Sequence, residues 1–202
     1  YKRLRALDEQ GKLPIYVDGS LVVNAERDAA EGLAEVKRYR DEYNTEHLKV
    51  HTMKIFMDGT QRIYTAAMVT PYVNTGTTGA TAFSAEGICD LVKNLNEAGL
   101  DLHLHTVGER ASRTVLDGYE MAKKELGDSL KVRVTCAHLE IQDDADLDRF
   151  AKLGVIANFT PHWHADDPKL YYHFLGEERA KKLFRCKTLW DSGALVAWSS
   201  DN

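Results

Sequence analysis

Leu100-Asp101-Leu102-His103-Leu104-His105 is the stretch that decides the fold of this chain. Its alternating apolar residues indicate a short strand that ends at His105. Val107-Gly108 then leads into a segment whose apolar positions, such as Val115 and Tyr119, have the spacing of a helix with one buried face. A strand followed at once by such a helix is the repeating unit of parallel sheets.

The same unit recurs on both sides of this stretch. Strand-like apolar runs alternate with helix-like segments, and glycines such as Gly99 and Gly154 mark helix ends. We expect strands at residues 13–17, 49–56, 100–105, 132–138, 155–159 and 195–199. We expect helices at residues 25–42, between an N-cap at Ser84 and Gly99, between Gly108 and Gly127, and at residues 143–153 and 176–192. A loop is expected at Asp18-Gly19-Ser20.

Alternating strands and helices predict an α/β fold, a parallel sheet covered by helices. Barrels of the (β/α)8 TIM type gather the carboxyl ends of all their strands at one mouth, where their chemistry sits. Such a barrel needs eight strands and typically about 250 residues, whereas this chain has 202 residues and about six predicted strands. We therefore predict that residues 1–202 form a single partial barrel domain, equivalent to about strands three to eight.

Composition and charge narrow the class of protein. Hydrophobic residues make up 44% of the chain and charged residues 28%, as in an ordinary globular domain. A net charge of −5 argues against nucleic acid as a partner. The sequence has neither an apolar run of about 18 residues nor an opening signal peptide, so we expect no membrane association. Its three widely spaced cysteines indicate reduced thiols in the cytoplasm rather than a disulfide framework.

Four residues near the ends of predicted strands could share a metal site: Lys54, His105, His138 and Asp201. A parallel sheet would bring these strand ends together, and we expect the four side chains to converge on one cavity. Each also has a simpler interpretation. The histidines could be hydrogen-bonded residues of a barrel rim, and Asp201 could be a helix N-cap.

Lys54 needs a chemical change before it can bind a metal, because a free ammonium has no lone pair. Burial favours the neutral amine, which can react with carbon dioxide to give a carbamate that behaves as a bridging carboxylate. The alternative is a lysine that extends its charged end to the surface. A neutral lysine could also act as a Schiff-base nucleophile in a barrel lyase or aldolase.

Together, residues 53–59, 105–111, 137–140 and 199–201 resemble successive motifs of the amidohydrolase superfamily, most closely its YtcJ-like branch (amidohydrolase family 3). The resemblance implies a metal-dependent hydrolase that cleaves carbon–nitrogen bonds other than peptide bonds in a small amide-type substrate. The His-x-His pair of the family's first strand and its small β domain are not visible upstream of Lys54. The chain is therefore expected to be an internal piece of the barrel, with little hydrolytic activity by itself.

The resemblance also implies a role for each residue. Lys54 would be the carbamylated bridging lysine, and His105 and His138 would be metal ligands. Asp201 would be both a ligand and the catalytic proton acceptor. One or two divalent ions, with zinc as the expected metal, would activate the attacking water.

Other residues have expected roles besides those of the metal ligands. Arg110, within the strand-five motif, and His162, in the loop after strand seven, are expected to contact substrate. For His162 the alternatives are a solvated loop and a second metal site with His164. His103 is expected to be a deeper interior histidine, because too few residues follow it for a first strand. Cys136, expected on the same face as His138, is interpreted as a small packed hydrophobe.

Two rival functions remain beside the hydrolase: the Schiff-base lyase that would use Lys54, and a non-catalytic regulatory or interaction protein on a degenerate barrel. The expected partner is a small-molecule substrate. Unpaired sheet edges would also permit a homo-oligomer.

Overall fold

The computed structural model describes residues 1–160, 162–163 and 167–201. These residues form one sheet of six parallel strands in the order β1-β2-β3-β4-β5-β6. The strands are β1 (Val17–Val23), β2 (Leu48–Phe56), β3 (Asp101–Thr106), β4 (Val134–His138), β5 (Ile156–Phe159) and β6 (Val196–Trp198). Sequential order in a parallel sheet is the arrangement of a barrel wall. The predicted α/β fold with a helix-covered parallel sheet is confirmed.

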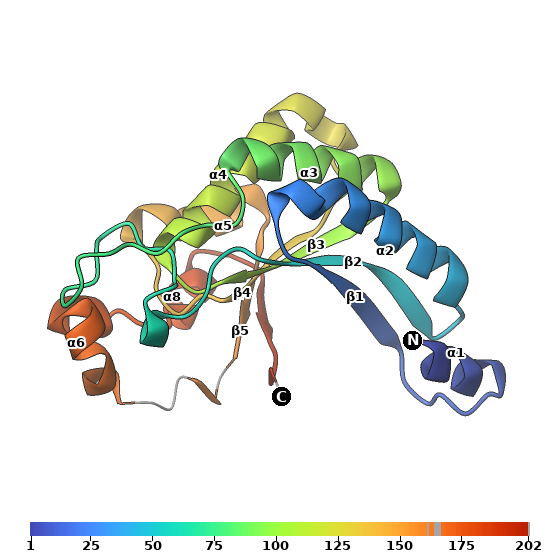
Figure 1. Ribbon diagram of the computed structural model, residues 1–202, viewed down its shortest axis with the longest axis horizontal. Coiled ribbons are helices and arrows are strands. Elements are labelled where there is room, and N and C mark those ends of the chain that lie inside the picture. Colours follow the sequence, from blue (N-terminus) through green and yellow to red (C-terminus); the bar gives the residue numbers. More distant parts are fainter. Residues whose placement is uncertain (161, 164–166, 202) are drawn as a thin grey trace.

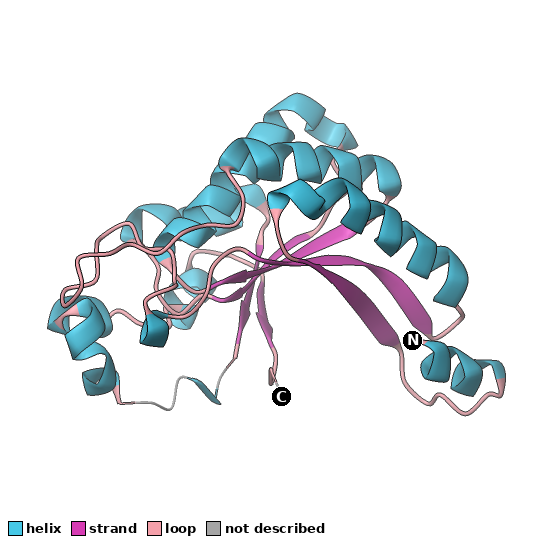
Figure 2. Cartoon of the chain, in the orientation of Figure 1, coloured by secondary structure: helices cyan, strands magenta, loops and turns pink. Residues whose placement is uncertain are grey.

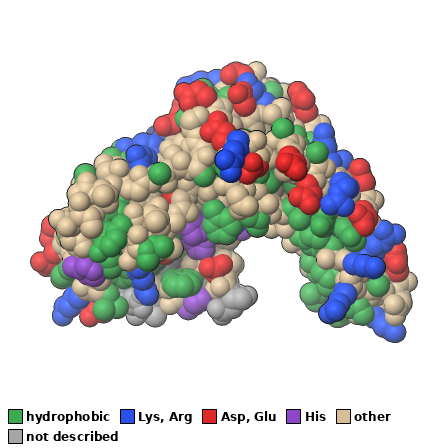
Figure 3. Space-filling view, in the orientation of Figure 1, with side chains coloured by type: hydrophobic (Ala, Val, Ile, Leu, Met, Phe, Trp, Pro, Cys, Tyr) green, Lys and Arg blue, Asp and Glu red, His purple; other side chains and the backbone are tan. Residues whose placement is uncertain are grey.

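Helices lie along the convex face of the sheet, and the opposite face is open and concave (Figures 1 and 2). In the space-filling view the molecule is an arch with a hollow on its underside (Figure 3). The helices are α1 (Lys2–Glu9), α2 (Ala29–Tyr43), α3 (Ala85–Ala98), α4 (Glu109–Leu126), α5 (Leu147–Leu153), α6 (Tyr172–Leu175), α7 (Glu177–Ala180) and α8 (Cys186–Asp191). Short 3-10 turns span Glu26–Asp28, Gln61–Ile63, Gly127–Ser129, Asp144–Asp146 and Pro168–Tyr171. Within the described residues, every helix is too short or too polar to cross a lipid bilayer.

The core lies between the sheet and the helices. Met53, Leu104 and Cys136 point into it and are fully buried, which confirms Cys136 as a packed residue. Because successive strand residues face opposite sides of a sheet, Lys54 on β2 and His105 on β3 take the concave face. Strand alternation thus separates the core residues from the candidate site residues.

The two predicted ends of α3 are confirmed by capping contacts. The Ser84 hydroxyl accepts a hydrogen bond from the Gly87 amide at 3.0 Å, as an N-cap of α3 should. Gly99 ends the same helix with a left-handed φ of 65°.

Two predictions about local structure were wrong, and one helix was missed. β1 begins at Val17, so Asp18-Gly19-Ser20 lies within the strand, where the pairing with β2 shifts after Gly19. Pairing with β2 outweighs the turn propensity of this segment. Helix α1 was not expected. The helix expected at residues 176–192 is broken into α7 and α8, because Phe184 adopts φ 54° and its amide donates to the Glu140 carbonyl at 2.9 Å.

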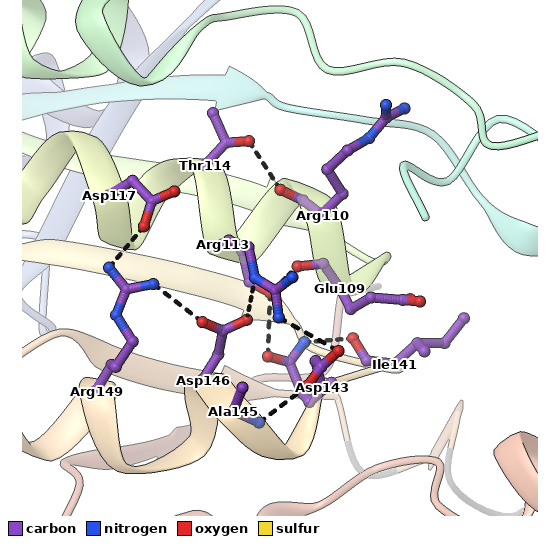
Figure 4. Close-up of polar contacts among 12 residues, drawn as sticks. Glu109, Arg110, Arg113, Thr114, Asp117, Ile141, Asp143, Ala145, Asp146 and Arg149 are labelled. Carbon is purple, nitrogen blue, oxygen red and sulfur yellow. Dashed lines mark hydrogen bonds and ion pairs between the residues drawn. The ribbon is translucent and has the colours of Figure 1, made fainter. Parts of the chain in front are cut away.

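A charged network joins α4 to α5 and to the 3-10 turn that precedes α5 (Figure 4). The buried carboxylate of Asp146 accepts from Arg113 at 2.8 Å and from Arg149 at 2.9 Å. Arg149 also reaches Asp117 on α4 at 2.7 Å. Because both oxygens of a buried carboxylate are paired here, the network fixes the two helices relative to each other.

The buried carboxylate of Asp58, just after β2, connects two loops at the carboxyl end of the sheet. It accepts hydrogen bonds from the backbone amides of Val107 (3.0 Å), Gly108 (2.8 Å) and Ala67 (2.9 Å). Val107 and Gly108 precede α4, whereas Ala67 belongs to the long connection between β2 and α3. One side chain therefore sets where the segments after β2 and β3 lie.

We predict that Asp58→Ala destabilises the chain by at least about 3 kcal/mol, because it leaves three buried amides without an acceptor and each such loss costs about 1–3 kcal/mol. Urea unfolding would measure this. Asp148→Ala removes an exposed carboxylate of α5 and should change the free energy of unfolding by less than about 0.5 kcal/mol. Equal effects of the two substitutions would contradict the role given to Asp58.

Candidate functional site

A cavity of about 300 Å³ opens among the loops that follow the strands. Histidine side chains are visible in the hollow under the arch (Figure 3). The cavity is lined by Thr60, Gln61, Arg62, His105, Val107, His138, Glu140, Trp163, Tyr171 and Asp201. His105, His138 and Asp201, three of the four residues predicted to share a site, therefore lie together.

The imidazoles of His105 and His138 lie side by side, with ring centroids 4.4 Å apart. His105 reaches the concave face through ordinary strand alternation. His138 follows the core-facing Cys136 by two residues, so the expectation that the two share a face was wrong. Left-handed φ angles of 77° at His138 and 50° at Leu139 turn the histidine inward. Such angles are costly for non-glycine residues and are concentrated at functional sites.

The surroundings of His105 fix which ring nitrogen can bind a metal. Its Nε2 lies 3.1 Å from the Gly59 carbonyl oxygen. A carbonyl can only accept, so Nε2 carries the proton and the lone pair of the neutral ring is on Nδ1. A hydrogen bond from the second ring nitrogen to a backbone carbonyl is also how metal-binding histidines are usually oriented.

Burial keeps both rings uncharged at neutral pH. It lowers the pKa of His105, and the nearby Lys54 adds to this while the contact with Gly59 opposes it. Burial, together with His105, Lys54 and His103, lowers the pKa of His138 to about 3. Neutral imidazole is the form that coordinates a divalent metal.

Asp201 lies just after β6 and lines the same cavity as the two histidines. Its Oδ2 lies 3.9 Å from Nδ1 of His138, and about half of its side chain is exposed. Like His138, it has a left-handed backbone, with φ 56°. A carboxylate beside an imidazole and open to the cavity is placed to exchange protons with a bound molecule.

Lys54 lies two residues further from the carboxyl end of the sheet than His105, whereas the two were expected to lie at the same level. It pairs in register with His103, whereas Phe56 pairs with His105, and Lys54 is not among the residues that line the cavity. Burial lowers the pKa of Lys54 to about 8, against the opposing effects of Asp201 and Cys136. An uncharged amine is thus accessible near neutral pH, and its carbamylation stays a prediction.

The donor set fits a divalent metal in its chemistry. It combines two neutral imidazoles, a carboxylate and a lysine of lowered pKa. In the described part of the chain, however, no three His, Cys, Asp or Glu side chains lie close enough together to enclose an ion. The arrangement is therefore an open set of donors rather than a closed coordination shell.

His103 lies beneath this set, as expected for an interior histidine. Its Nε2 is buried and has no hydrogen-bond partner among the described residues. Burial, helped by Lys54 and His105, lowers the pKa of His103 to about 4.

The two predicted substrate contacts lie outside the cavity lining. Arg110 donates to the carbonyls of Thr78 and Gly79, at 3.0 and 2.5 Å, and so anchors the loop before α3. His162 is exposed beside Trp163, and His164 is outside the described residues. The observed contacts give Arg110 a structural role, and substrate contact by either residue stays a prediction.

Sequence reasoning missed several cavity residues. The amide of Gln61 donates to the buried carboxylate of Glu140. Val107 and Tyr171 add buried apolar surface, and Trp163 is partly exposed. Glu140 and Val107 lie within the motifs at residues 137–140 and 105–111, which were usable signals. Gln61, Trp163 and Tyr171 come from loops whose course the sequence pattern does not reveal.

We predict that the metal-free chain loses stability as the pH falls. The pKa of His138 is about 3 in the fold and 6.5 when unperturbed, so below pH 6.5 the unfolded chain takes up a proton that the folded chain excludes. The contribution of the neutral His138 ring to the free energy of unfolding is complete above pH 6.5 and is lost as the pH approaches 3.

In urea unfolding with a chelator, the free energy of unfolding of the wild type falls between pH 7 and pH 5, and His138→Gln should make this decrease smaller by about 2 kcal/mol. His173→Gln, an exposed position on α6, should leave it unchanged. An unaltered pH dependence in the His138 variant would show that the ring is not held neutral.

Residues 1–202 match the model of the amidohydrolase family over their whole length. The exoenzymes regulatory protein AepA of Pectobacterium carotovorum subsp. carotovorum is 31% identical over 159 residues, which cover 78% of this chain and 33% of that protein. The putative amidohydrolase YtcJ of Bacillus subtilis (strain 168) is 28% identical over 156 residues, or 77% of this chain and 29% of YtcJ. The chain thus spans about a third of the length of these curated relatives.

Solved structures agree with this result. The whole chain superimposes on 40% of an uncharacterized metal-dependent hydrolase from Pyrococcus furiosus, with a TM-score of 0.80 and 26% identity. A corresponding protein from Pyrococcus horikoshii gives a TM-score of 0.79 with 25% identity, and 38% of its chain is covered. The sequence match over all 202 residues and the shared architecture lead to one conclusion: this chain belongs to the amidohydrolase family.

Proposed function

We propose that this chain carries most of the catalytic site of a metal-dependent hydrolase that cleaves carbon–nitrogen bonds, other than peptide bonds, in small amide-type substrates. The observation that carries the proposal is the pair of neutral imidazoles, His105 and His138, 4.4 Å apart with Asp201 beside them. Family membership and the metal-dependent hydrolases of the same fold support it.

In this proposal each residue has a defined task. His105, through Nδ1, and His138 would hold a divalent ion, with zinc as the proposed metal, and a carbamate on Lys54 would add oxygen donors. When bound, the ion would polarise the substrate carbonyl and lower the pKa of water to about 7. Asp201 accepts the proton of the attacking water and returns it to the leaving nitrogen. The hydrogen bond from His105 to Gly59 keeps the first imidazole oriented.

The metal site is tested by zinc binding to the metal-free 202-residue chain in equilibrium dialysis. Replacing both histidines in His105→Gln/His138→Gln should weaken binding by more than about 100-fold, because the neutral nitrogen donors are lost. His47→Gln/His173→Gln removes two histidines outside the cavity and should bind zinc like the wild type. Undiminished binding by the first double variant would place the metal elsewhere.

The proton-transfer role of Asp201 is tested in the full-length protein. Asp201→Asn keeps the size and one oxygen but removes the basic carboxylate, so kcat should fall by about 10²–10⁴-fold while KM changes little. Asp191→Asn, on the exposed end of α8, is the matched control and should keep wild-type kcat. A near-normal kcat in Asp201→Asn with unchanged metal content would refute the role.

The lowered pKa of Lys54, about 8, favours a second candidate, a lyase that forms a Schiff base. Borohydride treatment with a carbonyl substrate would then attach the substrate covalently to Lys54 and abolish activity. Amide hydrolysis that requires metal and resists borohydride would exclude this candidate.

A further inference from the structure

Gln61 is a buried amide at the mouth cavity, between the loops that support the two histidines. Its Nε2 donates a hydrogen bond to the buried carboxylate of Glu140. Gln61 follows Gly59 by two residues, and the Gly59 carbonyl faces Nε2 of His105. Glu140 in turn follows His138 by two residues. One hydrogen bond therefore links the segment that orients the first imidazole to the segment that carries the second.

The orientation of the Gln61 amide follows from the chemistry of its partner. A carboxylate only accepts hydrogen bonds, so Nε2 faces Glu140 and Oε1 is turned away from it. Oε1 is buried and has no hydrogen-bond partner among the described residues. A buried acceptor without a donor disfavours folding. An apolar side chain of the same length would avoid this cost, so the contact with Glu140, rather than the packing of the loop, accounts for an amide at this position.

The two linked loops are each held by backbone hydrogen bonds of their own. After β2, the amide of Gly59 donates to the Thr65 carbonyl at 3.1 Å, which closes the turn that contains Gln61. After β4, the amide of Leu139 donates to the Thr106 carbonyl at 3.0 Å. Because neither loop can deform freely, a side-chain contact between them fixes how far apart they lie.

The turn that carries His138 needs support from its surroundings. Its left-handed angles, φ 77° at His138 and 50° at Leu139, are unfavourable for these residue types. Angles of this kind persist where contacts with neighbouring segments hold them. The contact of Gln61 with Glu140 reaches this turn from the loop after β2.

We infer that Gln61 is a positioning residue of the candidate site. Through Glu140 it holds the turn of His138 against the loop that orients His105, and so keeps the two imidazoles 4.4 Å apart. The inference rests on the proposed function in taking both rings as metal ligands. Replacing a residue that orients metal ligands typically weakens metal binding by about 10–100-fold. Gln61 would thus contribute to metal binding without touching the ion.

The spacing of the rings is tested first without metal. In the metal-free 202-residue chain with 13C-labelled histidine, the nuclear Overhauser cross-peak between the ring protons of His105 and His138 reports their proximity. Gln61→Met keeps the length of the side chain but removes the donor, so the cross-peak should be lost. His105→Gln and His138→Gln each lack one of the two rings and therefore identify the peak in the wild type.

Gln142→Met is the matched control, because it also removes a buried amide, in this case from the segment after β4. Gln142 lies outside the lining of the mouth cavity and accepts a hydrogen bond from Ser112 at 3.1 Å. Its replacement should lower the urea midpoint of unfolding and leave the cross-peak intact. A purely structural role for Gln61 would give the same result in Gln61→Met, a less stable chain with an unchanged cross-peak.

Exchanging the two side chains tests whether the hydrogen bond itself matters. Gln61→Glu places two carboxylates together, so the cross-peak should be lost and zinc binding in equilibrium dialysis should weaken by at least about tenfold. Gln61→Glu/Glu140→Gln restores an amide-to-carboxylate hydrogen bond with the donor on the other loop, and both the cross-peak and zinc binding should return. Glu140→Gln alone completes the double-mutant cycle, which separates this contact from the other interactions of Glu140.

The two measurements separate this inference from the proposed function. If the cross-peak behaves as expected but neither the wild type nor any variant binds zinc, the metal site fails and the positioning role of Gln61 stands. The inference is overturned by an unchanged cross-peak in Gln61→Met, by its loss in Gln142→Met, by its absence from the wild type, or by a swapped pair that does not regain it.

Discussion

The geometry of the mouth depends on the buried carboxylate of Asp58. Its contacts with Ala67, Val107 and Gly108 hold the connection after β2 against the start of α4. Gly108 permits this approach, since a side chain there would meet the Ala67 carbonyl at 2.2 Å. Burial raises the pKa of Asp58 to about 7, although its three backbone amide donors act in the opposite direction. The same segments supply Val107 to the cavity wall and place Gly59 against His105.

The candidate site contains reactive groups whose backbone angles and burial destabilise the fold. His138 and Asp201 both have left-handed backbone angles. Burial lowers the pKa of His138 to about 3, so its ring stays neutral at pH values where a free imidazole is protonated. Burial in the same region lowers the pKa of Lys54. Groups of this kind are unfavourable in a fold unless something binds them, and an ion that coordinates neutral nitrogen would stabilise the folded chain. Strain and lowered pKa values thus meet at one end of the sheet.

The cavity contains the reactive groups of the proposed site and other lining residues that come from loops. The histidines and Asp201 would carry out chemistry common to amide substrates of many kinds. Val107, Trp163, Tyr171 and Glu140 line the same cavity without belonging to the proposed set of metal-binding residues. These residues come from loops, where selectivity can change without altering the strands that hold the reactive groups.

The sequence by itself determined the parallel α/β architecture and the position of His105 at a strand end, because period-two alternation and helix caps are encoded locally. It also indicated that His138 and Asp201 belong with His105, through motifs rather than through geometry. Only the tertiary structure decided which face His138 uses, how deep Lys54 lies and which loop residues line the cavity. A left-handed turn at His138, the register of β2 against β3 and the contacts of Asp58 are set by packing between segments distant in the chain. Local pattern cannot report these features, because their free energy comes from contacts that exist only after the chain has folded.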